Sequence, residues 1–476
     1  MCITPVSSFT QTSKASSQGV PPLAKASDFS MLGLPAYLPG FYSDYTRMDD
    51  PRDDGNLCYI FGGHLDRWGA DRICPHCGSV MHVKSRKSML LRHVPIGAWH
   101  SFVQVEAVQL ECTDCGHTHV QDIPFKALKH KITKELLQFI VDLLSMHQCT
   151  HSHISRITGV GVNAIKDIDY DRLKGLYTTD GHTIKKPERF SRFLAIDEFK
   201  LHRGHKYATH IIDLETGKVL YVARGKKKQV VYDFIEIVGK EWMSQVDAVA
   251  CDMNSDFQEA FQEKCPHIEI VFDHFHIVQN LNKYINCIRI AEQKRLKDEG
   301  KLEEANALKG MKYILLSSRE TLKSKEGSAA NANDVETPEK IYDQLIKQNK
   351  ILMTCDFVKE ALKRAFTAIN KEDMKEDLEW IIQICEESEN KYLKKFANLI
   401  KKHMDGILSH TEYNLTSGKI EGINNKIKTI RRMHYGIPED DYFFLMILDI
   451  NRKSYSKHYL FQVEGGMTFR LDSRAA

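Results

Sequence analysis

Three acidic side chains stand in settings that suit metal-dependent phosphoryl transfer. Asp197 and Asp252 each end a short apolar run, as residues do at the end of a buried strand. Glu421 is the sole acid in the basic stretch 417–435. Mg²⁺ prefers oxygen ligands and is usually held by a few protein carboxylates together with substrate phosphate. The pattern therefore predicts that these three carboxylates hold two Mg²⁺ or Mn²⁺ ions.

Each of these assignments has a plainer rival. An aspartate after a strand is often only a turn former, and a glutamate early in a helix can simply interact with the helix dipole. Three further carboxylates are alternatives, namely Glu198, Asp256 and Asp273. Glu198 directly follows Asp197 and so points to the opposite face of a strand. Asp273 also ends a strand and competes more seriously with Asp252.

Two Cys-x-x-Cys-Gly pairs predict a second, structural metal site. The pairs are formed by Cys74, Cys77, Cys112 and Cys115. Residues 101–111 alternate between apolar and polar types, as in a β-hairpin. Two thiolate knuckles at hairpin ends make a tetrahedral zinc ribbon, and four cysteines leave no open coordination position. The possible substitute ligands are His76, His117 and His119.

A pair of short helices is predicted after the zinc module. Residues 152–158 and 162–173 have helical patterns and are separated by Gly159-Val160-Gly161. A glycine-containing turn between two short helices fits a helix-turn-helix, although an ordinary helical hairpin is the alternative. Asn163 and Lys166 would lie on the exposed early part of the recognition helix. We therefore take both as candidate DNA contacts.

The elements that must position the acids follow from residue 192 onward. Three closely spaced apolar strands are followed by alternating helix and strand, which predicts a mixed α/β sheet of ribonuclease-H-like order. Residues 281–410 then have amphipathic helical patterns nearly throughout, which indicates a helical insertion. The chain rejoins the core with Glu421, on a helix expected to start at Thr416-Ser417-Gly418.

Taken together, the motifs resemble bacterial insertion-sequence transposases of the DDE type, specifically the ISL-three group. The resemblance covers most of the chain from the zinc ribbon to about Leu448. Besides the two cysteine pairs, it is carried by Ala195-Ile196-Asp197-Glu198, Cys251-Asp252-Met253, Phe272-Asp273-His274-Phe275-His276 and Ser417-Gly418-Lys419-Ile420-Glu421-Gly422-Ile423-Asn424-Asn425. It implies that Asp197, Asp252 and Glu421 form the catalytic triad. It also implies that water first frees a 3′-hydroxyl at the transposon end, which then attacks target DNA.

The length of 476 residues favours several domains. The expected divisions are a mobile N-terminal tail (1–55), a zinc-ribbon DNA-binding domain (56–125), a helix-turn-helix DNA-binding domain (126–185), the first part of the ribonuclease-H-like core (186–290), the all-helical insertion (291–410), and the final core helix with a C-terminal tail (411–476).

The distribution of charge along the sequence indicates which partners the protein binds. The net charge is only +3, so clustered basic residues matter more than the total. The candidate phosphate contacts near the Glu421 helix are Lys426, Lys428, Arg431 and Arg432. We expect double-stranded DNA as the partner, both as terminal inverted repeats and as target. Because two ends must be held together, we expect a homodimer or larger assembly on DNA.

No apolar run approaches the ~18 residues of a membrane span, so no membrane role is expected. Eight of the 12 cysteines are scattered singly, as in a reducing compartment. We therefore expect a bacterial cytoplasmic protein that associates with the nucleoid when bound to DNA. Two other functions remain open, a non-catalytic DNA-binding regulator derived from a transposase and a ribonuclease-H-like nuclease without strand transfer. The intact acidic triplet argues against the first, whereas the second would have the same metal site.

Overall fold

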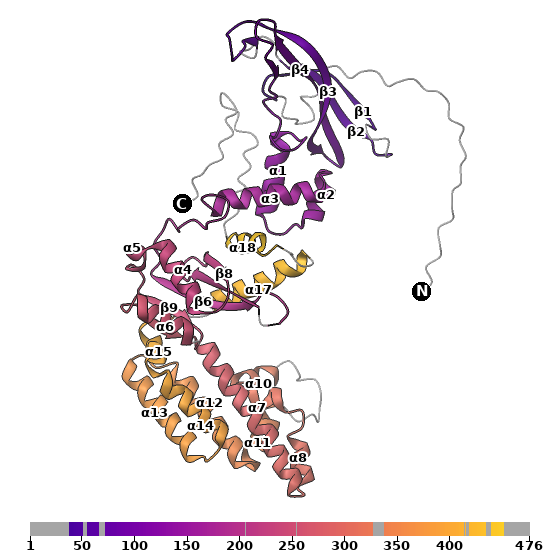
Figure 1. The fold of residues 1–476 in the computed structure, drawn as a ribbon. Coiled ribbons are helices and arrows are strands. Elements are labelled where there is room, and N and C mark those ends of the chain that lie inside the picture. The colour runs from indigo at the N-terminus through magenta and orange to yellow at the C-terminus, as the bar shows by residue number, and fades with distance from the viewer. Residues whose placement is uncertain are drawn as a thin grey trace, which may run out of the picture. The chain divides into compact units, whose positions relative to one another are not determined.

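The computed structural model describes residues 38–50, 55–65, 72–204, 206–253, 255–326, 338–413, 415, 418–434 and 439–451. Contacts divide this part of the chain into two units, one up to Asp171 and the other from Arg172 (Figure 1). The model has sheets and many helices in a mixed α/β chain, as expected. No helix in these ranges is long and apolar enough to cross a membrane.

The N-terminal unit is built on a five-stranded sheet. Its strands are β1 (Phe41–Asp49), β2 (Cys58–Leu65), β3 (Met81–Ile96), β4 (Trp99–Cys112) and β5 (Thr118–Val120). They lie in the order β1-β2-β4-β3 with β5 beside β4; β2 and β4 run parallel and the other pairs are antiparallel. The long β3–β4 hairpin turns at Gly97, whose φ of 58° suits glycine, and it confirms the predicted hairpin.

The ordered sheet begins earlier than the sequence analysis expects. Strand β1 falls within the stretch 1–55, which we assigned to a mobile tail. The Phe41 ring packs edge-on against Phe125 at 5.5 Å, and the Tyr45 hydroxyl donates to Gln104 Oε1 at 3.1 Å. These aromatic contacts attach β1 to the sheet. The composition of the whole segment 1–55 resembles that of a mobile tail and therefore does not predict this strand. Residues 1–37 lie outside the described ranges.

Three helices follow, α1 (Lys134–Ser145), α2 (His151–Thr158) and α3 (Val162–Tyr177). The hydroxyls of Thr133 and Thr150 accept hydrogen bonds from Leu136 N and His153 N, each at 3.2 Å, and so cap α1 and α2. Gly159 ends α2 with a φ of 68°, and an added Cβ there would come within 2.1 Å of a buried arginine, Arg92. The two short helices and their glycine turn are therefore confirmed, and α3 extends past the predicted end at residue 173.

The C-terminal unit contains the second sheet. Its strands are β6 (Phe193–Lys200), β7 (Tyr207–Asp213), β8 (Val219–Arg224), β9 (Ala248–Cys251) and β10 (Glu269–Phe272). The order is β10-β9-β6-β7-β8, in which β6 to β8 form an antiparallel meander and β9 and β10 run parallel to β6. This is the predicted sequence of strands in a mixed sheet.

Helices cover both faces of this sheet. They are α4 (Lys228–Val238), α5 (Lys240–Met243), α6 (Ser255–Lys264), α17 (Gly418–Met433) and α18 (Asp440–Leu448). Ile196 of β6 packs in one core with Phe234 of α4, whereas the Phe199 ring meets Phe443 of α18 at 6.3 Å. Alternate side chains of a strand point to opposite faces, so Asp197 shares the face of α17 and α18. The predicted cap residues of α17, Thr416 and Ser417, lie outside the described ranges.

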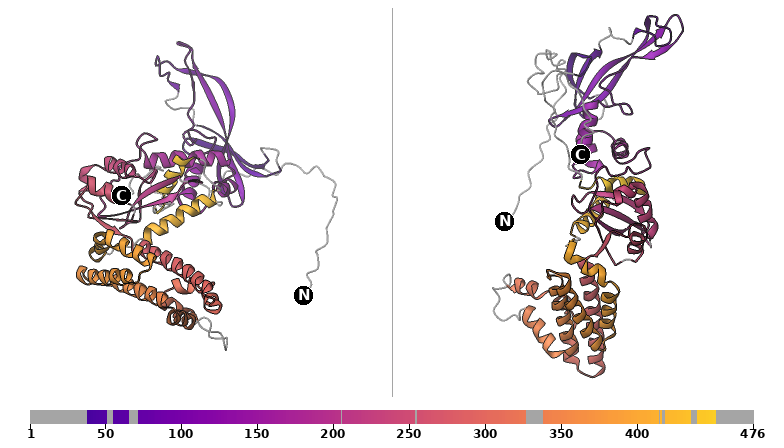
Figure 2. Two further views of the ribbon diagram at one scale, coloured as in Figure 1. Left: turned by 60° about the horizontal axis from the view of Figure 1, so that its bottom comes forward. Right: turned by 90° about the vertical axis from the view of Figure 1, so that its left-hand side faces the viewer.

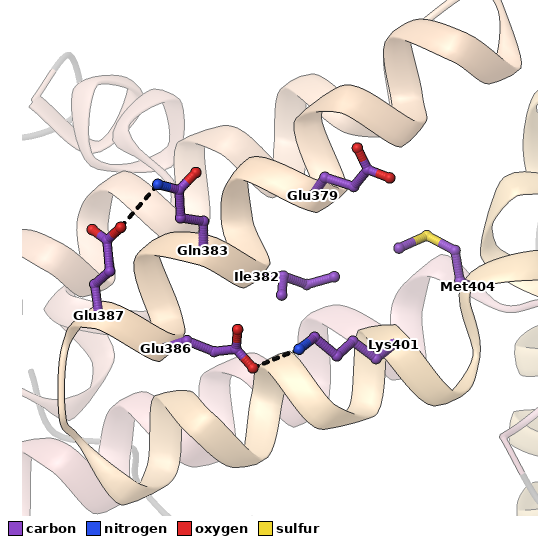
Figure 3. A pocket seen from close by; sticks show the side chains of 7 residues that line it. All are labelled: Glu379, Ile382, Gln383, Glu386, Glu387, Lys401 and Met404. Carbon is purple, nitrogen blue, oxygen red and sulfur yellow. Dashed lines mark hydrogen bonds and ion pairs between the residues drawn. The ribbon is translucent and has the colours of Figure 1, made fainter.

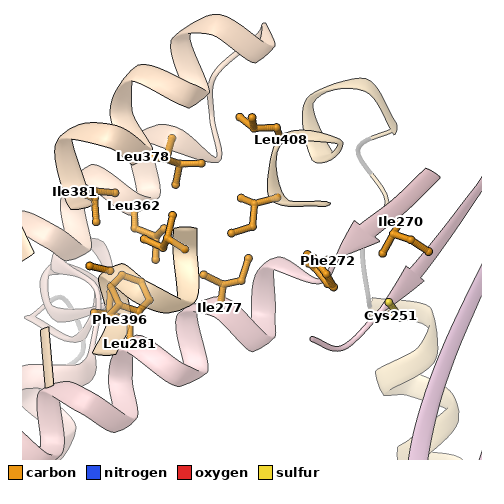
Figure 4. Close-up of a cluster of buried hydrophobic side chains, with 14 of the residues drawn as sticks. Cys251, Ile270, Phe272, Ile277, Leu281, Leu362, Leu378, Ile381, Phe396 and Leu408 are labelled. Atoms are coloured by element: carbon orange, nitrogen blue, oxygen red, sulfur yellow. The ribbon is translucent and has the colours of Figure 1, made fainter. Parts of the chain in front are cut away.

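All regular secondary structure described between β10 and α17 is helical, as predicted. Its helices are α7 (His274–Asp298), α8 (Leu302–Ala307), α9 (Lys312–Leu316), α10 (Arg319–Glu326), α11 (Pro338–Gln348), α12 (Lys350–Ala365), α13 (Lys371–Glu387), α14 (Lys391–Lys402), α15 (Met404–Leu408) and α16 (His410–Tyr413). Figure 2 shows the long helices side by side, with α7 leading from the sheet into the bundle. The apolar core continues from Phe272 of β10 to Leu281 and Phe396 of the bundle (Figure 4).

Candidate functional site

Three aspartates meet at one edge of the C-terminal sheet. Strand β9 lies between β6 and β10, and Cys251 is paired with both Ile196 and Phe272. The next residue in each chain segment is an aspartate, namely Asp197, Asp252 and Asp273. Because the three strands are parallel and paired in this register, the three aspartates lie level with one another across the sheet. Asp252 and Asp273 follow the ends of their strands as predicted, whereas β6 continues past Asp197 to Lys200 because its far side still pairs with β7. The structure thus places the two predicted aspartates and their rival Asp273 at the same edge.

Asp197 is the central and best-held of these carboxylates. Its Oδ1 accepts the Glu198 N–H at 2.7 Å, and its Oδ2 accepts the Asn424 side-chain amide at 2.6 Å. Burial raises the pKa of Asp197, and these two hydrogen bonds act in the opposite direction. The side chain is therefore fixed by two donors, one on each oxygen.

Asp252 and Asp273 differ in their surroundings. The Asp252 side chain is 41% exposed and accepts the Met253 N–H at 2.6 Å. Asp273 is only 8% exposed and caps α7 by accepting the Phe275 N–H at 3.0 Å. His276 lies between them, with ring nitrogens 3.6 Å from Asp252 Oδ1 and 3.7 Å from Asp273 Oδ2. Asp273 thus already has a structural task, whereas Asp252 offers the more open carboxylate.

Glu421 reaches this region through α17. Ile420, Ile423 and Ile427 bury one side of that helix, which contacts β6. Glu421 itself is exposed and lies three residues before Asn424, the residue bonded to Asp197. Its carboxylate does not form a group with those of Asp197 and Asp252 in which all ligand atoms lie within 4.8 Å. The structure therefore places α17 beside the aspartates, but the carboxylates of Asp197, Asp252 and Glu421 do not form one compact group.

The predicted basic contacts on α17 fall into two pairs. Arg431 donates to the backbone carbonyls of Lys200, at 2.8 Å, and Leu201, and Lys426 bonds to Asn451. Lys428 and Arg432 are exposed. These two residues come seven and eleven positions after Glu421, which places them on the same stripe of the helix. Lys426 is exposed as well, so three of the four predicted basic contacts are accessible to a phosphate.

The four predicted zinc ligands come together in the N-terminal unit. Each cysteine sulfur lies within 4.8 Å of the others, and no other such group of His, Cys, Asp or Glu occurs among the described residues. Gly78 and Gly116 follow the two pairs with φ of 77° and 68°, and each donates its N–H to the first cysteine of its pair at 2.9 Å. These turns aim the sulfurs at a common centre. Four convergent thiolates fit tetrahedral Zn²⁺, so the cluster fits a zinc ribbon.

The two residues of α3 that we predict to contact DNA are accessible to different degrees. Asn163 is exposed in the first turn of α3, and Lys166 is half-buried. Ile154, Val160 and Ile165 are buried in the core shared with α1. The turn is therefore held rigidly, while the early part of α3 keeps a polar surface.

Two residues beside Asp197 escape sequence reasoning. His210 pairs directly with Asp197 across β6 and β7, so it shares the same face of the sheet. It is fully buried, neither ring nitrogen has a hydrogen-bond partner among the described residues, and burial lowers its pKa to about 4. Asn424 is the second, and its three-residue spacing from Glu421 on a predicted helix is a signal that could have found it. The pairing of β6 with β7 places His210 beside Asp197, and no local sequence pattern predicts the register of that pairing.

A pocket of about 550 Å³ lies elsewhere, between α13, α14 and α15 (Figure 3). It is lined by Glu379, Ile382, Gln383, Glu386, Glu387, Lys401 and Met404. Lys401 Nζ and Glu386 Oε1 pair across it at 2.6 Å. None of the residues predicted from the sequence lines this pocket, so the candidate site is the sheet edge.

The four-cysteine cluster and the carboxylates of the mixed α/β sheet contain ligand types that suit metal ions, and comparison with known proteins supplies the class of the protein. The ISL3 family model (DDE_Tnp_ISL3), described as "Transposase", matches residues 194–447. The chain therefore belongs to this transposase family, which confirms the resemblance found in the sequence.

Curated relatives extend over both units. The "Transposase for insertion sequence element IS1001" of Bordetella parapertussis is 26% identical over 404 residues, which cover 84% of this chain and 93% of the relative. The "Transposase for insertion sequence element IS1557" of Mycobacterium tuberculosis is 26% identical over 407 residues, which cover 81% and 86%.

Proposed function

We propose that this transposase is a DDE-type enzyme that binds the terminal inverted repeats of its insertion sequence and catalyses Mg²⁺-dependent end cleavage and strand transfer. The observation that carries the proposal is the sheet edge. There Asp197 lies within β6 and Asp252 directly follows the adjoining parallel strand β9, and the helix that bears Glu421 is hydrogen-bonded to Asp197. The family assignment supports the same chemistry.

The proposed core is ribonuclease-H-like. Three antiparallel strands followed by two strands parallel to the first support this assignment. The proposal keeps the division into zinc ribbon, helix-turn-helix, core and helical insertion, with the start of the first ordered domain moved forward to include β1.

The carboxylates suit a hard divalent cation. Bound Mg²⁺ would activate the attacking oxygen and stabilise the leaving oxygen of an in-line displacement. Asp197, the central carboxylate, would hold the ions together with Asp252 and Glu421. The two proposed reactions, hydrolysis at the transposon end and attack of the freed 3′-hydroxyl on target DNA, need no covalent enzyme intermediate.

DNA binding is assigned to both units. The zinc ribbon and helix-turn-helix would recognise the ends, with Asn163 and Lys166 as contacts. Lys428 and Arg432 share a stripe of α17 with Glu421, so they would hold the phosphates of the reacting strand. Two transposon ends must be joined in one reaction, which favours a dimer or larger assembly on DNA.

The test incubates the purified full-length protein with labelled DNA that carries the element's ends, in Mg²⁺ or EDTA. Wild type is compared with Asp252→Ala and Glu421→Ala. We expect metal-dependent cleavage and joining in wild type, and retained end binding without strand breakage in both variants. Specific binding by wild type without any breakage would instead indicate a regulator, and breakage without joined products would indicate a nuclease.

A further inference from the structure

We infer that Asn424 is a positioning residue of the proposed active site, which holds the Asp197 carboxylate in a single orientation for metal binding. This inference rests on the proposed function. It concerns a side chain that is not itself an acid and therefore is not among the three expected metal ligands.

The first step is the hydrogen bonding of Asp197. An ionised carboxylate has about four lone-pair positions, two on each oxygen. Glu198 N–H occupies one on Oδ1, at 2.7 Å, and the Asn424 amide occupies one on Oδ2, at 2.6 Å. Two donors on different oxygens prevent the carboxylate from rotating. They leave one lone pair on each oxygen available to a cation.

The second step is the placement of Asn424. Buried Ile420, Ile423 and Ile427 anchor α17 on the sheet, so the Asn424 amide approaches Asp197 from a fixed helix. Glu421 precedes Asn424 by three residues, and residues three apart are neighbours on a helix surface. Asn424 thus connects the position of Glu421 to that of Asp197, although the two acids lie far apart in the sequence.

The side-chain amide of Asn424 also has an oxygen without a partner in the described part of the chain. Asn424 Oδ1 is buried and has no hydrogen-bond partner among the described residues. Leaving a buried amide oxygen unpaired is unfavourable, so an asparagine whose only role is to fasten α17 to the sheet would not require it. The oxygen belongs to the amide that bonds Asp197 and therefore lies beside the carboxylate. An amide oxygen is also a donor type that hard divalent cations accept.

The experiment compares Asn424→Ala with Asn425→Ala, because Asn425 is the exposed neighbour on the same helix. Asn424→Leu, which keeps the branching and the number of heavy atoms of the side chain, serves as a second variant in case alanine impairs folding. Mn²⁺ binding to the zinc-loaded full-length protein is measured by titration calorimetry, alongside thermal stability and cleavage kinetics on end DNA. Losing an outer partner of a metal ligand typically weakens metal affinity or activity 10–100-fold. We expect Mn²⁺ affinity and kcat to fall by that factor in both Asn424 variants, with KM for DNA and all properties of Asn425→Ala unchanged.

Asn424 variants that bind Mn²⁺ like wild type and lose only thermal stability would overturn the inference, because Asn424 would then merely fasten α17. The Asp252→Ala variant separates this failure from that of the proposed function. If wild-type Mn²⁺ binding does not change in Asp252→Ala, the carboxylates do not form the metal site, and the proposed function fails together with the inference.

Discussion

At the scale of single residues, the sheet edge shows how equivalent aspartates acquire different tasks. Asp197 is held by two donors and Asp273 caps α7, whereas Asp252 keeps a 41% exposed side chain. The sequence presents Asp252 and Asp273 as rivals because both follow apolar strands. Exposure and hydrogen bonding favour Asp252 as the ligand.

The two aspartates give the first prediction. Asp252→Asn should lower the rate of metal-dependent DNA cleavage by on the order of 10³-fold, because removing a metal-held charge forfeits several kcal/mol of transition-state stabilisation. Asp273→Asn keeps a side-chain oxygen that can cap α7 and should retain most activity. Single-turnover cleavage of end DNA measures both. Equal inactivation of the two variants, at equal stability, would contradict the assignment.

Adjacent arginines on α17 give the second prediction. Arg431 is half-buried, its guanidinium donates to two backbone carbonyls, and burial lowers its pKa. Arg431→Ala should therefore destabilise the protein by about 2–3 kcal/mol in urea unfolding. Arg432→Ala should leave stability unchanged but reduce the slope of log affinity for DNA against log salt concentration by about 1. The reverse pattern would show that Arg431 is the phosphate contact.

At the scale of elements, the zinc cluster joins the ends of strands that would otherwise splay. Cys74 and Cys112 are buried, and the cluster borders a small core that contains Met81 and Leu110. A core this small cannot hold the hairpin end by burial alone, so metal should supply much of the stabilisation.

The third prediction follows from this cluster. Cys112→Ser should reduce bound zinc from about one ion per chain to a small fraction, and should abolish specific binding to transposon ends. The matched control is Cys149→Ser, a half-buried cysteine outside the cluster. Zinc analysis and a DNA-binding assay measure the two effects. Full zinc content in Cys112→Ser would show that the cluster is not the metal site.

A buried histidine couples β3 to α1 and gives the fourth prediction. His93 bonds the N-cap residue Thr133 at 2.9 Å, and burial lowers the pKa of His93 to about 4. In the unfolded chain His93 has its ordinary pKa near 6.5. Between pH 6.5 and 4, the unfolded chain therefore binds a proton at His93 that the folded protein does not bind. Stability is therefore complete above about pH 6.5 and is lost as the pH falls toward 4, by roughly 3 kcal/mol.

Urea unfolding of wild type and His93→Asn across this pH range tests the effect. Asparagine can still bond Thr133 but does not titrate, so the variant should lose about 3 kcal/mol less between these pH values. An identical pH dependence in the two proteins would mean that His93 does not contribute.

The elements themselves were predictable because their signals are local. Apolar periodicity, the Gly159 turn and the cysteine spacing all act over a few residues, and the corresponding strands, helices and cluster are present. Strand β1 was missed because its aromatic anchors sit in an otherwise tail-like composition. The Asn424–Asp197 hydrogen bond joins residues 227 positions apart. A sequence pattern indicates which side of a helix or strand is buried but not which other element packs against that side, so this bond could not be predicted.

At the scale of the whole molecule, hydrogen bonds join the first and last described segments of the C-terminal unit. Arg172 and Tyr177, at the end of α3, bond Asp449 at 2.9 and 2.5 Å. The side chains of Arg172 and Asp449 are only 10% and 1% exposed. Removing one partner of a buried ion pair leaves the other charge uncompensated.

The fifth prediction concerns this closure. Asp449→Ala should destabilise the C-terminal unit by about 3–5 kcal/mol and lower its thermal midpoint. Asp441→Ala is the control, because Asp441 is a mostly exposed partner of Arg224 and should cost less than about 1 kcal/mol. Calorimetry of the full-length variants distinguishes the two. Equal small losses would mean that the buried pair does not hold the unit together.

The wide separation of the acids along the chain also has a consequence during synthesis. Asp197 leaves the ribosome about 220 residues before Glu421, which at about 5–20 residues per second is roughly 10–45 s. The N-terminal unit is complete before either acid is made. Under the proposed function, a chain whose translation stops within the helical insertion would occupy transposon ends without cutting them. Such fragments would compete with the intact protein, so the position of Glu421 makes incomplete products inhibitors of transposition.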